Sequence, residues 1–253
     1  MVQRIAAVTG ASSGLGRDIA CAFGEQGWSV GIGARRLERL EETADEIRKL
    51  GGKAAAFPLD VCDAGSVNAF FAEVTSTFEA APDLVVVNAG AGVPGSIEDQ
   101  DPEEIRSVVD TNLLGAAFCA KRALKAFAFL GRQADLVFIS SESVERPVPH
   151  MLPYGMAKAA VEYLAEGLRI ETAGRDIRIT TLRLGPAMSE FGAGFDQERA
   201  IEMLNAWNAA GINMQGALLS GEQVAEAVLH AVSAPSGVVV RGMQVGPARP
   251  PSE

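Results

Sequence analysis

Residues 5–16 read IAAVTGASSGLG, and this stretch decides the fold. Ile5–Thr9 is a short run of apolar and small residues that predicts a buried strand, and a turn rich in glycine follows it. Glycines allow a tight turn, and a helix beginning there would offer free N–H groups and its positive dipole end to a pyrophosphate. The G-x-x-x-G-x-G spacing therefore predicts a phosphate-binding turn. Its expected contacts are Gly10, Ser12, Ser13, Gly14, Leu15 and Gly16.

The same turn also matches G-x-S-x-G, the nucleophile elbow of α/β-hydrolases, which likewise joins a strand to a helix. In this alternative Ser12 is the nucleophile and His150 or His230 is the base. An elbow needs earlier strands to supply the oxyanion loop, and only eight residues precede Thr9. The alternative also leaves unexplained a set of Ser, Tyr and Lys residues further along the chain.

Apolar runs alternate with amphipathic stretches from end to end. This alternation predicts an α/β fold, a doubly wound parallel sheet of about seven strands with helices on both faces. The runs are continuously apolar, as expected for strands covered on both faces. The expected strands are 5–9, 29–33, 54–57, 84–87, 136–139, 177–182 and 238–240. The expected helices lie near 14–26, 37–50, 64–79, 102–129, 154–173 and 222–233.

The sequence shows no internal repeat and no interdomain linker. We therefore expect one domain over residues 1–247, followed by a flexible tail at 248–253. Residues 188–219 carry large apolar side chains among glycines, and so long a segment between a strand and a helix predicts a substrate lid. An ordinary helical insertion packed on the body is the alternative.

Charge and composition exclude several classes of partner. The net charge is −10, which argues against a nucleic acid or an anionic membrane as partner. Three widely spaced cysteines and no run of the ~18 apolar residues that a membrane span needs predict a cytoplasmic protein. With two histidines and no clustered cysteine or carboxylate partner, no metal site is expected.

Tyr154 and Lys158 are four residues apart, so a helix would place them on one face. Bringing the pKa of a phenol from about 10 to neutrality takes roughly 4 kcal/mol. A positive charge at ~4 Å supplies about 1 kcal/mol in water and about 4 kcal/mol at an effective dielectric of 20. The pair can therefore act as an acid/base only in a partly dry cleft. Ser141 stands thirteen residues before Tyr154.

Several further matches stand in a fixed order along the chain. Asp60-Val61 follows the third expected strand, Asn88-Ala89-Gly90 follows the fourth, and Asn112 lies in a T-N-L-L-G segment. Together with the glycine-rich turn and the Ser, Tyr and Lys residues, this set closely resembles the single-domain branch of the short-chain dehydrogenase/reductase family. The resemblance extends to about Pro247 and implies a Rossmann-type fold.

The resemblance implies a role for each matching residue. Tyr154 would be the general acid for carbonyl reduction and the base for alcohol oxidation, and Lys158 would lower its pKa and hold the nicotinamide ribose. Ser141 would hydrogen-bond the substrate oxygen, and Asn112 would hold a water in a proton relay to Lys158. The residues expected to line the cofactor cleft are Asp60, Val61, Asn88, Ala89, Gly90, Gly185 and Ser189. Of these, Ser189 stands where a threonine often contacts the cofactor amide.

The end of the second expected strand indicates which cofactor to expect. An acidic residue there would bind the ribose hydroxyls of NAD, but the sequence reads G-A-R-R from Gly33, with no carboxylate until Glu38. A guanidinium fork matches a 2′-phosphate. We therefore predict NADP(H), with Arg35 as the main contact and Ser12, Ser13 or Arg36 helping. The alternative is that these arginines, with Arg39, form a solvated helix start.

The resemblance as a whole implies an oxidoreductase that transfers a hydride between NADP(H) and a small to medium, fairly apolar ketone or secondary alcohol. It also implies a homodimer or homotetramer. The alternative is a catalytically silent, NADP-binding regulatory protein of the same fold.

Overall fold

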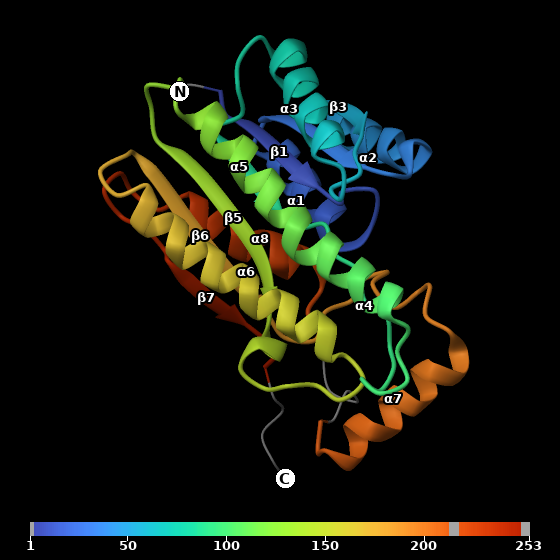
Figure 1. The fold of residues 1–253 in the computed structure, drawn as a ribbon. Coiled ribbons are helices and arrows are strands. Elements are labelled where there is room, and N and C mark those ends of the chain that lie inside the picture. The colour runs from blue at the N-terminus through green and yellow to red at the C-terminus, as the bar shows by residue number, and fades with distance from the viewer. Residues whose placement is uncertain (1–2, 213–217, 249–253) are drawn as a thin grey trace.

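The computed structural model describes residues 3–212 and 218–248, and it contains one seven-stranded parallel sheet (Figure 1). The strand order is β3-β2-β1-β4-β5-β6-β7, which confirms the predicted doubly wound α/β fold. The strands are β1 Ile5–Thr9, β2 Ser29–Ala34, β3 Lys53–Pro58, β4 Leu84–Val87, β5 Ala134–Ser141, β6 Ile177–Leu184 and β7 Gly242–Val245. The helices are α1 Gly14–Glu25, α2 Leu37–Lys49, α3 Ala64–Phe78, α4 Pro102–Val109, α5 Gly115–Phe127, α6 Leu152–Glu171, α7 Gln197–Ala209 and α8 Gly221–Val232.

Two apolar layers, one on each face of the sheet, form the core. On one face α1, α2 and α8 bury residues such as Phe23, Ile47 and Val228 against alternate strand residues. On the other face α3, α5 and α6 do the same, with Phe71 and Leu168 among their buried side chains. The inner strands are apolar on both faces because helices cover both, as parallel sheets require.

The last strand lies four residues later than predicted. Residues 238–240 are an apolar run outside the sheet, and Val238 and Val239 are exposed. The strand is instead β7, whose Met243 pairs with Leu182 of β6. An edge strand is covered less than an inner one, and β7 alternates exposed and half-buried residues. The prediction of the last strand from hydrophobicity alone was therefore wrong.

The helix predicted over 102–129 is interrupted. It consists of α4, a π-helical turn at Asp110–Leu114 and then α5, which ends at Phe127. A π turn inserts one residue into the helical repeat and is frequently found at functional sites. Hydrophobic spacing along the sequence does not reveal it, because helical geometry resumes at Gly115.

A buried ion network ties the amino ends of the strands together. Asp135 of β5 accepts hydrogen bonds from Arg178 of β6 at 2.7 and 2.9 Å and from Arg4 at 2.6 Å. Arg178 also donates to the Val232 carbonyl at the end of α8. Removing one partner of a buried ion pair typically costs about 3–5 kcal/mol because the other charge stays buried. The network therefore stabilises the edge of the sheet opposite the glycine-rich turn.

The described residues contain no helix that is long and apolar enough to cross a membrane. Of the predicted tail, only Ala248 lies within the described residues.

Candidate active site

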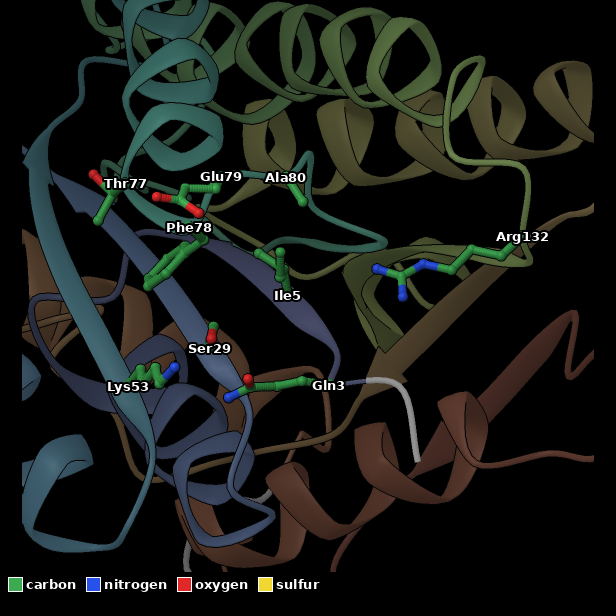
Figure 2. Close-up of a pocket in the computed structure, with 9 residues that line it drawn as sticks. All are labelled: Gln3, Ile5, Ser29, Lys53, Thr77, Phe78, Glu79, Ala80 and Arg132. Carbon is green, nitrogen blue, oxygen red and sulfur yellow. The ribbon is translucent and has the colours of Figure 1, made fainter.

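The sequence-predicted site residues lie in the segments at the carboxyl edge of the sheet, where ligands bind in open parallel sheets. The turn after β1, the loop after β4, the end of β5 and the start of α6 bring them there. A cavity of about 570 Å³ lies at the opposite edge, beside the amino ends of β1 and β2. Its lining residues, among them Ile5, Ser29 and Arg132, are drawn in Figure 2. None of the predicted site residues lines that cavity.

The glycine-rich turn is packed too closely for side chains. Gly10 has φ +70°, and a Cβ there would lie 2.8 Å from the Ala89 Cα. A Cβ at Gly16 would lie 2.4 Å from the Asn88 Nδ2. Within the described residues, no side chain caps α1 at Ser13, and its first turn holds no acidic residue. The first N–H groups of α1 therefore remain free for an anion, and the turn fits a pyrophosphate.

Asn88 joins the carboxyl ends of β1 and β4. Its Nδ2 donates to the Thr9 carbonyl at 3.0 Å and to the Gly10 carbonyl at 3.3 Å. The Thr9 hydroxyl in turn accepts from the N–H groups of Asn88 and Ala89, both at 3.1 Å. We did not predict Thr9 as a site residue, because a buried threonine that ends a strand gives no distinctive sequence signal.

Asn112 is buried in the π turn and holds the neighbouring loop. Its Nδ2 donates to the carbonyls of Ala91 and Val108 at 2.7 and 2.8 Å. A Cβ at Gly90 would lie 2.9 Å from the Asn112 Oδ1 and 3.7 Å from the Lys158 Nζ. The structure thus brings Asn112 and Lys158 to the same face of Gly90.

Ser141, Tyr154 and Lys158 meet where β5 ends and α6 begins. Lys158 is buried, and its ammonium donates to the Ile139 carbonyl of β5 at 2.8 Å. The same nitrogen lies 5.5 Å from the centre of the Tyr154 ring. The Ser141 hydroxyl accepts from the Ser143 N–H at 3.2 Å and is hydrogen-bonded to the Tyr154 hydroxyl.

Burial dominates the protonation of this group. It raises the pKa of Tyr154 to about 12, although the hydrogen bond with Ser141 acts in the opposite direction. It lowers the pKa of Lys158 to about 8. Burial therefore outweighs the expected lowering of the Tyr154 pKa in this structure. Desolvation disfavours both charged forms, and the ammonium donates to a backbone carbonyl.

The remaining predicted cofactor contacts flank this centre. The Asp60 carboxylate accepts from the Cys62 N–H at 2.9 Å, and Val61 is buried beneath Gly115. On the other side, the Gly185 N–H donates to the Val245 carbonyl at 2.8 Å, which fixes the loop after β6.

Arg36 is the arginine that the structure places on the glycine-rich turn. Its guanidinium donates to the Ser12 hydroxyl at 3.2 and 3.3 Å and to the Ser13 hydroxyl at 2.6 Å. Arg35 is exposed and forms no hydrogen bond or ion pair with the described part of the chain. Arg39 was not among the predicted contacts, yet it shares the carboxylate of Glu190 with Arg36. No sequence signal linked residues so far apart in the chain.

The hydrolase alternative is not supported by the contacts of Ser12. Its hydroxyl accepts from Arg36, and neither His150 nor His230 hydrogen-bonds to it. His230 is exposed on α8.

The segment predicted as a lid contains α7 and covers the tyrosine. The ring of Phe191 lies 4.9 Å from that of Tyr154, and Phe195 packs edge-on against Phe191 at 5.7 Å. Trp207 of α7 donates to the Pro149 carbonyl at 2.7 Å. Arg199, also of α7, pairs with Glu104 at 2.6 and 3.0 Å. The segment therefore contains a helix that packs on the body, and its Phe191 contacts Tyr154. Met214, one of its apolar residues, lies outside the described residues.

Comparison with known proteins agrees with the family resemblance that the sequence motifs indicate. The model of the short chain dehydrogenase family matches residues 4–200. The chain is 30% identical to sulfoacetaldehyde reductase 2 of Chromohalobacter salexigens over 97% of this chain and 94% of that one.

Two solved structures share the fold over 96% of each chain. An alcohol dehydrogenase from the archaeon Thermococcus sibiricus, complexed with 5-hydroxy-NADP, has a TM-score of 0.81 and 30% identity. A 3-ketoacyl-(acyl-carrier-protein) reductase from Brucella melitensis, complexed with NADH, has a TM-score of 0.81 and 25% identity. By its site geometry and by these matches, the chain belongs to the short-chain dehydrogenase family of oxidoreductases.

Proposed function

We propose that the protein transfers a hydride between NADP(H) and a small to medium, fairly apolar ketone or secondary alcohol. The observation that carries this proposal is the half-buried Tyr154, whose hydroxyl is hydrogen-bonded to Ser141 and whose ring lies beside the buried Lys158 ammonium. A phenol kept protonated by burial is a proton donor ready for a carbonyl oxygen.

The chain's own residues handle the oxygen and its proton. The bound nicotinamide supplies or accepts the hydride. In reduction, Ser141 donates a hydrogen bond to the carbonyl oxygen, and Tyr154 transfers its proton to that oxygen as the hydride reaches carbon. The phenolate that remains is stabilised by the positive charge of Lys158. Asn112 would hold a water in the relay that returns a proton to this site through Lys158. In oxidation, Tyr154 accepts the proton from the alcohol.

The residues present fit a phosphorylated dinucleotide. The free N–H groups at the start of α1 suit the pyrophosphate, and we assign the buried Lys158 ammonium to the nicotinamide ribose. We assign the 2′-phosphate to Arg35, which has no partner among the described residues, with Arg36, Ser12 and Ser13 beside it. The related Thermococcus enzyme, complexed with 5-hydroxy-NADP, supports a nicotinamide dinucleotide.

The substrate side is apolar. Phe191 packs on Tyr154 and Phe195 packs on Phe191, so a substrate that reaches the phenol would contact aromatic carbon. A relative named for reducing sulfoacetaldehyde supports carbonyl reduction as the reaction. The silent regulatory protein remains the alternative, but Asn112, Ser141, Tyr154 and Lys158 are all present, which favours turnover.

We also infer that the protein is a homodimer or homotetramer. Met156, Tyr163 and Ile170 of α6 are 61%, 84% and 73% exposed and recur every seven residues, so they form one apolar stripe along the helix. Burying this stripe against a second copy would remove it from water. Light scattering in dilute solution is expected to give a multiple of the 26.5 kDa chain mass, and the mass of one chain would contradict the inference.

Tyr154→Phe tests the general acid. Loss of the hydroxyl is expected to lower ketone reduction by about 100-fold to 10,000-fold, the contribution of a positioned acid. Single-turnover oxidation of NADPH with a panel of ketones measures it. Tyr163→Phe is the matched control, because Tyr163 is the chain's other tyrosine and is 84% exposed. Equal rates for the two variants would contradict the proposal.

Arg35→Asp tests the cofactor assignment. The dissociation constant for NADPH is expected to rise about tenfold to a hundredfold, the range for hydrogen bonds to a charged group. NADH binding is expected to hold or improve, because a carboxylate can accept from ribose hydroxyls. Fluorescence titration of both cofactors measures this, with Lys49→Asp at the far end of α2 as the matched charge change. A wild-type protein that binds NADH more tightly than NADPH would contradict the assignment.

A further inference from the structure

Glu190 lies between two arginines that flank the proposed phosphate site. Its carboxylate accepts hydrogen bonds from the Arg36 Nη1 at 3.1 Å and from the Arg39 Nη1 at 2.8 Å. Arg36 and Arg39 belong to the segment that follows β2, whereas Glu190 belongs to the loop after β6. One carboxylate from the loop after β6 therefore pairs with two guanidiniums at the start of α2 and offsets only one of their two positive charges.

The Arg36 guanidinium also contacts the glycine-rich turn. Arg36 donates to the Ser12 and Ser13 hydroxyls while it donates to Glu190. Hydrogen bonds from Arg36, then from Arg39 and Ser13, lower the pKa of Glu190, so it is ionised at neutral pH. A carboxylate and a phosphate accept from guanidinium groups in the same way. Glu190 thus occupies donors that a phosphate would use.

Glu190 is part of a strap, residues 189–191, that runs from the arginines to the tyrosine. A Cβ added at Gly14 would lie 3.5 Å from the Ser189 Cβ and 3.5 Å from the Glu190 nitrogen. The strap is therefore packed against the start of α1. The next residue, Phe191, packs on the Tyr154 ring. The strap therefore lies beside Gly14, at the end of the turn proposed to bind the pyrophosphate.

We propose that Glu190 is a specificity-determining residue, which competes with the 2′-phosphate of NADP(H) for Arg36 and Arg39. The proposal rests on the proposed use of NADP(H). A phosphate must displace the carboxylate or be repelled by it, so Glu190 weakens the binding of cofactors that carry a 2′-phosphate. NAD(H) carries an uncharged hydroxyl at that position and meets no such competition.

Glu190→Gln tests this competition, because it removes the charge and keeps the shape. The dissociation constant for NADPH is expected to fall about twofold to fivefold, the range for an exposed ion pair, while that for NADH stays unchanged. Cofactor fluorescence titration measures both. Calorimetry with adenosine 2′,5′-bisphosphate and with ADP isolates the adenosine end, and only the bisphosphate is expected to bind more tightly.

Glu198→Gln is the matched control, because Glu198 is an exposed carboxylate in the first turn of α7. It removes the same charge and is expected to change neither cofactor's affinity. If Glu190→Gln leaves NADPH affinity unchanged or weakens it, or tightens NADH equally, the role of Glu190 is overturned. A wild type that binds NADH more tightly than NADPH would instead count against the proposed use of NADP(H).

Discussion

The chemistry of this site depends on the burial of one ammonium beside one phenol. Lys158 is buried and held by the Ile139 carbonyl, and Tyr154 is half-buried under Phe191. Burial moves the two pKa values in opposite directions, to about 8 for the lysine and about 12 for the tyrosine. The neutral phenol is thereby favoured. This state suits a proton donor, and a phenolate becomes stable only when positive charge lies near it.

The fold supplies the rigid frame that this burial needs. The strand β5 carries both the Ile139 carbonyl and Ser141, and it is paired with β4 and β6. At its other end the buried network of Asp135 and Arg178 fixes the strand register. The π turn directs Asn112 inward, and Gly90 leaves room for its amide beside the Lys158 ammonium. Small shifts in these elements would expose the pair to water and move both pKa values back toward their ordinary range.

Features that follow from local sequence were predictable. Strand–helix alternation indicated the parallel sheet. The glycine spacing indicated the tight turn after β1, and the close contacts at Gly10 and Gly16 explain why glycine is needed there. Spacing along α6 brought Tyr154 and Lys158 together correctly. Features set by contacts across space were not predictable. The edge strand β7 is defined by its pairing with β6 more than by its hydrophobicity, and the π turn interrupts a pattern that still reads as helical. The pairing of Glu190 with Arg36 joins residues 154 positions apart.

The most direct test of the central claim is the ionisation of Tyr154 itself. Ultraviolet absorption of tyrosinate can be followed in a Tyr163→Phe variant, which keeps Tyr154 as the chain's remaining tyrosine. With a pKa of about 12, Tyr154 is expected to be about one per cent ionised at pH 10 in the protein alone, and addition of NADP⁺ is expected to increase that fraction. A phenol that is half ionised at pH 10 without cofactor would contradict the account, because burial would then not control its proton.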